Sequence, residues 1–284
     1  MKRKLILSGA ILLCTMVLCG SAAAWGRMGH AAVVKIAQNH LTKKARKEVD
    51  KIMHGQALVT YASYPDEFRD VLDATFKPEW GHGVPHAHTF EVDDSFQPYD
   101  TLFLPKNGRT IINAVYFADH CLKDLANHKD LPDSIAWKEL VMTIHLIGDM
   151  HCPGHIRYAD KHKDIAKYPV TFIGESTDYH TVWDGAMVTS PFPFSYSDIA
   201  EICDDCTQEQ IDEICKGTIY DWGKDVAIKC YDTRKSVKKG DNLDRKWMRE
   251  HSTLSRTQMR NAGYRLAHSL NMVFDPKYAR KHSK

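Results

Sequence analysis

Residues 133–151, DSIAWKELVMTIHLIGDMH, constrain the fold of this chain more than any other segment. Their apolar side chains recur at helical spacing, which predicts a buried helix that Asp133 caps and that ends before Pro153. The same helix carries His145 and Asp149, which are four residues apart and therefore lie on one face. Because a carboxylate in an apolar helix needs a cation or several donors, this pair favours metal binding over a core helix with two tolerated polar side chains.

The first 24 residues read as a separate unit. A basic start (MKRK), an apolar run (LILSGAILLCTMVLC) and a stretch of small residues (GSAAA) follow in the order of a secretory signal peptide that is cleaved after Ala24. The apolar run is too short to span a bilayer comfortably, so no stable membrane anchor is expected. We therefore predict that residues 1–24 are a signal peptide and that the protein is secreted or periplasmic.

The charge balance excludes general polyanion binding through a basic surface. The full chain has 38 basic and 36 acidic residues, and the predicted signal peptide removes Lys2, Arg3 and Lys4 but no acid, which leaves 35 basic residues. A nearly neutral chain has no broad positive electrostatic field that would attract phosphate groups. Any attraction for phosphate must then come from a few local cations or from bound metal.

Six of the eight cysteines follow the signal peptide. A four-cysteine zinc site is one interpretation of their cluster, but zinc ribbons normally contain two tight pairs and here only one pair is tight. In an exported protein, disulfides are the better interpretation, although the spacing leaves their connectivity open. Cys121 and Cys152 stand apart, and the clustered residues are Cys203, Cys206, Cys215 and Cys230.

The rest of the chain also reads as mainly helical, without a repeat or a flexible linker. An alternating stretch at residues 84–94 instead predicts a short extended segment, with His86, His88, Phe90 and Val92 on one face. We predict a single all-α domain over residues 25–284, with long loops and at most short extended segments. The further helices are expected at residues 29–41, 43–53, 109–128 and 255–274.

A second His–Asp pair repeats the spacing of the first. His180 and Asp184 are four residues apart, after a possible cap at Ser176 or Thr177. One such pair is a weak signal because surface ion pairs share the spacing, but two pairs in one exported chain are more specific.

The predicted new chain end adds a third group of ligands. Cleavage after Ala24 would make Trp25 the N-terminal residue, and its free amine and carbonyl can chelate a metal in a five-membered ring. His30 follows five residues later, near the start of the first predicted helix. The chain end and the two His–Asp pairs together predict a centre with several metal ions.

The order of these residues resembles the trinuclear-zinc, single-strand-specific nucleases of the S1/P1 family, whose superfamily includes bacterial zinc phospholipase C. The pattern is Trp-(four)-His, Asp-x-x-Arg, His, His-(three)-Asp-(five)-His and His-(three)-Asp, and it extends from Trp25 to the C-terminal AGYRLAHSLN. Its most specific parts are the gap between Asp149 and His155 and the VWD that follows His180. The resemblance therefore covers almost the whole chain after the signal peptide.

The resemblance implies three zinc ions with about three ligand groups each, which leaves positions open for water and substrate as catalytic zinc requires. Arg69, three residues after Asp66, would contact the phosphoryl oxygens, and His86 is the alternative to His88. The ligands would be Asp66, His88 and His145 for one zinc, Trp25 and His30 for the next, with Asp149 bridging these two, and His155, His180 and Asp184 for the third.

The activity that the resemblance implies is hydrolysis of single-stranded DNA or RNA to products with a 5′ phosphate, together with hydrolysis of 3′-nucleotides. Two zinc ions sharing Asp149 would generate a hydroxide that attacks phosphorus, and Arg69 would offset charge on the phosphoryl oxygens. We therefore expect an exported zinc-dependent endonuclease with Arg69, Asp66 and Asp149 in catalytic roles. Single-stranded nucleic acid or nucleotides are the expected substrates, and no protein partner is predicted.

Three rival functions fit the sequence less well. In phospholipase C the last ligand is typically Glu, whereas this chain has Asp184. A non-catalytic zinc-binding protein would not need Arg69 next to its metals, and a zincin peptidase is disfavoured because no His-Glu-x-x-His motif occurs. The Gly-Gly-Asn stretch of the family nucleases is missing between His155 and His180, which leaves substrate and base preference open.

Overall fold

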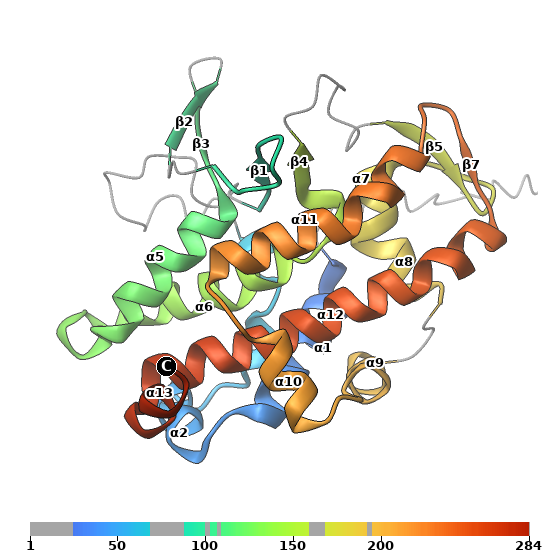
Figure 1. Cartoon of the computed structure of the whole chain (residues 1–284). Coiled ribbons are helices and arrows are strands. Elements are labelled where there is room, and N and C mark those ends of the chain that lie inside the picture. The colour runs from blue at the N-terminus through green and yellow to red at the C-terminus, as the bar shows by residue number, and fades with distance from the viewer. Residues whose placement is uncertain are drawn as a thin grey trace, which may run out of the picture.

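The computed structural model describes residues 25–68, 88–99, 103–106, 109–158, 168–191 and 195–283, with the backbone alone at 103–106 and 109–112. These residues form a mostly helical fold with a few short strands, which confirms the predicted all-α class (Figure 1). The longer helices are α1 (Gly26–His40), α2 (Lys43–Ile52), α5 (Ala114–Ala126), α6 (Asp133–Asp149), α9 (Tyr196–Cys203), α10 (Gln208–Ile214), α11 (Ile219–Ser236), α12 (Arg245–Phe274) and α13 (Pro276–His282).

Short helical turns and strands connect these helices. The turns are η1 (Leu58–Tyr61), α3 (Tyr64–Glu67), η3 (His128–Asp130), η4 (Pro153–His155), α7 (Tyr179–Thr181), the π-helical η6 (Val182–Ala186) and α8 (Met187–Thr189). The strands are β1 (Phe90–Val92), β2 (Phe103–Lys106), β3 (Arg109–Ile112), β4 (Ile156–Tyr158), β5 (Pro169–Phe172), β6 (Glu175–Asp178) and β7 (Asn242–Leu243). The predicted signal peptide at residues 1–24 lies outside the described residues.

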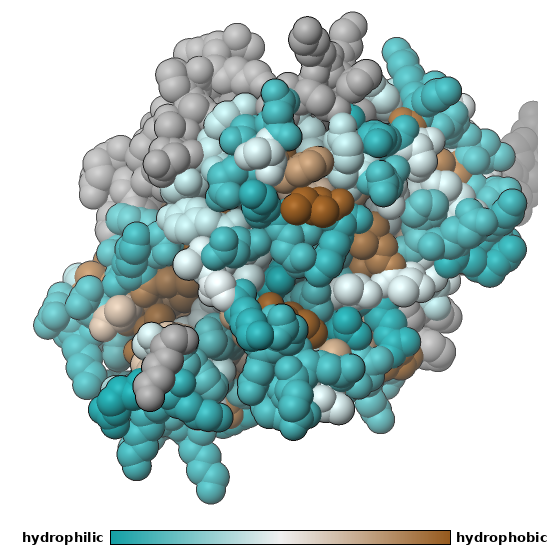
Figure 2. Space-filling model, viewed as in Figure 1, coloured by the Kyte–Doolittle hydropathy of each residue, from teal (hydrophilic) through white to brown (hydrophobic). Residues whose placement is uncertain are grey.

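The described surface is mainly polar. Figure 2 shows one face that is mostly hydrophilic, with separate hydrophobic patches between the polar side chains. The exposed large apolar residues lie on different elements and are Phe68, Ile202 and Ile228. Within the described ranges, no helix combines the length and the apolar character that crossing a membrane requires.

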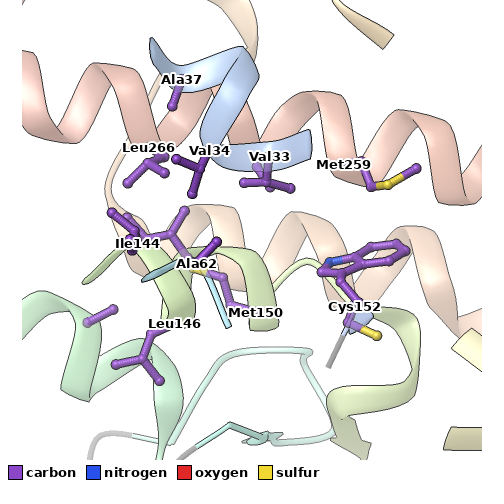
Figure 3. Packing of buried hydrophobic residues seen from close by; sticks show 14 of the residues in the cluster. Val33, Val34, Ala37, Ala62, Ile144, Leu146, Met150, Cys152, Met259 and Leu266 are labelled. Carbon is purple, nitrogen blue, oxygen red and sulfur yellow. The ribbon is translucent and has the colours of Figure 1, made fainter. Parts of the chain in front are cut away.

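The core forms where α1 and α12, from opposite ends of the chain, pack against each other and against α6. Figure 3 shows Val34 and Ala37 of α1 and Leu266 of α12 on one side, facing Ile144 of α6. The close approach of α1 and α12 needs a glycine, because a Cβ at Gly263 would lie 2.5 Å from Ile36 Cγ2. This packing holds the start of α1 against α6, where the candidate site forms.

The predicted helix at residues 109–128 was wrong in its first turn. Residues Arg109–Ile112 form β3, antiparallel to β2, and α5 begins only at Ala114. The β-branched run of Thr110, Ile111 and Ile112 favours a strand. Asn113 then caps the helix, since its side chain accepts a hydrogen bond from Val115 N at 3.0 Å.

Two predicted helix caps were also wrong. Asp133 is the first residue inside α6, and Pro132 precedes it without any side-chain cap, so Asp133 contributes negative charge to the first turn instead. The helix does end before Pro153, as expected. The cap of α7 is Asp178, whose side chain accepts from Thr181 N at 2.8 Å, rather than Ser176 or Thr177, which belong to β6.

The C-terminal helix is longer than predicted. Helix α12 starts at Arg245, ten residues before the predicted segment at 255–274, because Asp244 accepts hydrogen bonds from Lys246 N and Trp247 N and caps it there.

The predicted disulfides are not confirmed: the six cysteines beyond residue 24 all lie in described ranges, and none pairs with another.

The short sheets bring distant segments together. The extended segment predicted at residues 84–94 is confirmed over Phe90–Val92, whereas residues 84–87 lie outside the described ranges. Strand β1 runs parallel to β4, with Phe90 opposite Ile156. Because His88 lies just before β1 and His155 just before β4, this pairing places the two histidines side by side.

Candidate metal centre

The centre is built on one face of α6. His145 and Asp149 are both buried, and His145 Nε2 lies 3.1 Å from Asp149 Oδ2. His145 Nδ1 lies 3.0 Å from the Ala62 carbonyl oxygen and donates to it in the tautomer that leaves Nε2 with its lone pair. Asp66 Oδ1 is 3.6 Å from the same Nε2. Because the hydrogen bond at Nδ1 fixes the ring of His145, Nε2 is oriented to bind a metal ion.

The first residues of α1 close this group from the other side. The ring of His30 stacks on that of His145 with a centroid distance of 4.3 Å, and His30 Nε2 lies 3.2 Å from Asp149 Oδ1. Trp25 is buried, and its indole Nε1 donates to the Gly148 carbonyl oxygen at 2.9 Å. Residues 25–30 are therefore anchored directly on the turn of α6 that carries Asp149.

A second group of side chains continues from the end of α6. The chain turns at Pro153 and places His155 between two carboxylates: Nδ1 is 3.6 Å from Asp149 Oδ1, and Nε2 is 3.1 Å from Asp184 Oδ1. His180 Nε2 lies 2.9 Å from Asp184 Oδ2. The segment that carries Asp184 is also close to the start of α1, since a Cβ at Gly26 would lie 3.1 Å from the Asp184 carbonyl oxygen.

His88 joins the second group rather than standing alone. Its ring centroid is 5.2 Å from that of His155 and 6.1 Å from that of His180. Its ligation to the metal of Asp66 and His145 stays a prediction. Arg69 and His86, the other residues that the sequence singled out in this region, lie outside the described residues.

Several buried nitrogen and oxygen atoms of the centre have no hydrogen-bond partner among the described residues. Both ring nitrogens of His30 and His155 and both carboxylate oxygens of Asp149 are fully buried, and none has hydrogen-bond geometry with a described residue. Buried polar atoms rarely stay unsatisfied, so their convergence fits a cation between them. Ligand atoms within 4.8 Å of one another come from His30, Asp66 and His145, and from Cys152, His155 and Asp184.

Burial and neighbouring charge oppose each other in this centre. Burial lowers the pKa of His30, and His145 lowers it further. Burial also acts to lower the pKa of His145, but the carboxylates of Asp149 and Asp66 outweigh it and raise that pKa well above its usual range. Burial acts to raise the pKa of Asp149 and Asp184, yet the adjacent histidines hold both well below the ordinary value. Ionised carboxylates in a dry cluster favour a cation there, and it would displace the histidine protons.

The structure also contains a groove that sequence patterns did not predict. It has a volume of about 480 Å³ and opens between the start of α1 and the η1–α3 segment, and its lining includes Glu67, which follows Asp66 in the sequence. Tyr64 and Phe68 stack in it with their ring centroids 4.5 Å apart, and Phe68 is 44% exposed. Aromatic residues around Asp66 in YASYPDEF were the available signal. The other lining residues include Arg27, Met28, Tyr61 and Tyr196.

The fold and the cluster define a class: a mostly helical protein with a candidate multi-metal centre made of histidine, aspartate and the first residues of α1. Within that class the chain belongs to the S1/P1 nuclease family, whose sequence model matches residues 25–275. It is therefore a nuclease-family hydrolase, with nucleic acid as the implied substrate.

Plant endonucleases are among the proteins to which the chain is similar. Endonuclease 2 of Arabidopsis thaliana is 21% identical over 276 residues, which cover 88% of this chain and 90% of the relative. Endonuclease 4 of the same plant is 21% identical over 295 residues, which cover 95% of this chain and 96% of the relative. Endonuclease 3 is 25% identical over 195 residues, or 66% of this chain and 62% of that relative.

Proposed function

We propose that this protein is an exported, zinc-dependent endonuclease that cleaves single-stranded DNA or RNA to products with a 5′ phosphate and that also hydrolyses 3′-nucleotides. The single observation that carries the proposal is the convergence of the side chains of Asp149, His30, His145 and His155 in one buried cluster. Family membership supports phosphodiester hydrolysis at that cluster. Export rests on the signal-like residues 1–24, and residues 25–284 would form the functional unit.

The donor set fits zinc. Imidazole nitrogen and carboxylate oxygen are zinc ligands, and several of these atoms are buried without a hydrogen-bond partner among the described residues. When bound, zinc would supply Lewis-acid polarisation of the phosphoryl group and a nucleophile at neutral pH. We propose three ions, held by Trp25, His30, Asp66, His88, His145, Asp149, His155, His180 and Asp184.

The residues of the chain contribute orientation and charge. Asp149 presents one oxygen to His145 and the other to His30 and His155, so it is the residue suited to bridge neighbouring sites. The Ala62 carbonyl keeps the ring of His145 in one orientation. Arg69 follows Asp66 by three residues, and its planar guanidinium would bind phosphoryl oxygens and stabilise the charge that develops on them.

The aromatic groove supports the preference for unpaired strands. Bases of single-stranded nucleic acid stack on aromatic side chains in a sequence-tolerant way, whereas bases inside a duplex are not accessible for such stacking. Tyr64 and Phe68 are each two residues from Asp66 in the sequence, so a base stacked there would be close to a phosphate bound at the metal centre. Arg27 also lines the groove, and its Nε lies 2.8 Å from Glu67 Oε1 in this structure. A backbone phosphate would replace Glu67 as the partner of this guanidinium.

A panel of substrates tests the proposal. Chain beginning at Trp25, loaded with zinc, is incubated with single-stranded DNA, RNA, duplex DNA, 3′-nucleotides and phosphatidylcholine. Cleavage of the single strands, abolished by chelation and restored by zinc, is expected. Hydrolysis of the lipid alone would favour phospholipase C, and inactivity towards every substrate despite bound zinc would favour a zinc-binding protein.

A further inference from the structure

Cys152 lies inside the second group of candidate ligands, where the sequence pattern assigned no cysteine. It is completely buried, and its sulfur lies 3.3 Å from Asp184 Oδ1. The Cys152 sulfur, a His155 ring nitrogen and an Asp184 oxygen all lie within 4.8 Å of one another. This cysteine is thus in direct contact with residues that were assigned to one zinc ion.

We propose that Cys152 binds the metal at this site through its sulfur, as a ligand beside His155 and Asp184. The inference rests on the proposed metal centre. It changes the donor set of the third metal from three nitrogen and oxygen ligands to four ligands that include sulfur, so substrate would enter there as a fifth ligand.

The spacing of the atoms supports direct ligation. Donors about 2.0–2.3 Å from one zinc ion and separated by tetrahedral angles lie about 3.3–3.6 Å apart. The sulfur–oxygen distance is 3.3 Å, and His155 Nε2 is 3.1 Å from the same Asp184 oxygen. Two of the three mutual distances therefore match neighbouring corners of one coordination shell, and the third, from the sulfur to a His155 ring nitrogen, is at most 4.8 Å.

A second observation points to a ligand independently of the cysteine. His155 is fully buried, and neither of its ring nitrogens has hydrogen-bond geometry with a described residue. One of them is directed at the Asp184 oxygen that Cys152 also contacts. A cation among these donors would satisfy the imidazole, the carboxylate and the sulfur together.

The two sides of the site differ in exposure. His180, the ligand expected from the sequence, has a side chain that is 19% exposed and contacts the second oxygen of Asp184. Cys152 lies on the fully buried side. The cysteine would bind the ion from the buried side of the site. Its soft sulfur would favour Zn²⁺ and Cd²⁺ over Mg²⁺ and Mn²⁺. Binding would release the thiol proton to solvent.

Cobalt substitution tests the inference without relying on activity. Chain beginning at Trp25 is stripped of metal and reloaded with Co²⁺, and the near-ultraviolet spectrum is recorded together with the metal content. A thiolate-to-cobalt charge-transfer band is expected in the wild type and in Cys203→Ser, which alters the only tightly spaced cysteine pair. The band should disappear in Cys152→Ser, and zinc affinity at one site should fall by about 10–100-fold.

The serine variant separates ligation from a hydrogen bond, because a serine hydroxyl can still donate to Asp184. Several bound ions with no thiolate band in the wild type would overturn the sulfur ligand and leave the metal centre standing. A band that persists in Cys152→Ser would overturn it as well, and Cys152→Ala is compared should the serine variant not fold. Failure of the wild type to bind any cobalt or zinc would overturn the proposed function itself.

Discussion

Gly148 leaves open the space that the ring of His30 occupies, since a Cβ at Gly148 would lie 2.7 Å from His30 Nδ1. The carbonyl oxygen of the same glycine accepts the indole hydrogen bond of Trp25. One residue of α6 therefore positions both the start of α1 and its histidine, directly next to Asp149.

Replacing this glycine should disturb the centre. In Gly148→Ala the new methyl group would push His30 away, cost about 1–3 kcal/mol of stability and lower the zinc content. Thermal unfolding and elemental analysis measure the two effects. Gly185→Ala is the matched control, because a Cβ there meets no atom within 4 Å. Equal zinc content in the two variants would contradict the role of Gly148.

Asp149→Asn should remove more metal than any single histidine variant, because both carboxylate oxygens contact histidines of the centre. We expect the loss of at least one ion per chain and a fall in nuclease activity of more than about 100-fold. Elemental analysis and a single-strand cleavage assay provide the measurements. Asp232→Asn, at a side chain that is 96% exposed, should match the wild type. Unchanged metal content in Asp149→Asn would count against the bridge.

The chain end can be tested separately from the indole. Chain prepared to begin at Trp25 has a free α-amine there; one extra residue before Trp25 removes it and should lower activity by about tenfold or more and reduce metal content. Trp25→Phe keeps the amine but loses the hydrogen bond to Gly148 and leaves a buried carbonyl without its donor, so it should lose about 1–3 kcal/mol of stability and retain its metal. Full activity of the extended chain would refute the terminal ligand.

The aromatic groove should affect substrate affinity rather than chemistry. Removing one stacking ring costs about 1–3 kcal/mol, so Phe68→Ala should raise KM for a single-stranded oligonucleotide by about 5–150-fold with little change in kcat. Steady-state kinetics provide the measurement. Ile228→Ala removes another exposed apolar side chain, on α11, and should leave KM unchanged. A fall in kcat alone for Phe68→Ala would rule out a stacking role.

His151 should contribute to acid sensitivity. Burial and the adjacent Arg265, whose Nη1 lies 3.0 Å from His151 Nε2, lower the pKa of His151 to about 3. The unfolded chain takes up this proton below about pH 6.5 while the folded chain does not, so stability falls with acidification between about pH 6.5 and 3.

The size of this effect is limited to about 1.4 kcal/mol for each pH unit in that window. His151→Gln, which cannot gain the proton, should flatten the acid side of the stability profile relative to the wild type. Urea unfolding of metal-free protein at several pH values measures the difference. Parallel profiles for the two proteins would show that His151 does not contribute.

The sequence determined the helical class and the local spacing of the ligands. Period-3.6 patterns predicted α1, α2 and α6, and two His–Asp pairs at i,i+4 follow from helical geometry alone. Local sequence patterns gave the wrong element or cap where neighbouring residues favour different structures. At β3 a run of β-branched residues forms a strand instead of the predicted helix, and at α7 the helix is capped by Asp178 instead of Ser176 or Thr177.

Only the tertiary structure decided which of these residues meet. Gly148 leaves room for the ring of His30, the β1–β4 pairing places His88 beside His155, and the turn at the end of α6 brings Cys152 to Asp184. These contacts depend on packing between segments far apart in the chain, where a missing Cβ or a strand register sets distances of a few ångströms. Sequence spacing encodes which side chains share a helix face, whereas convergence on one point requires the packed core of α1, α6 and α12.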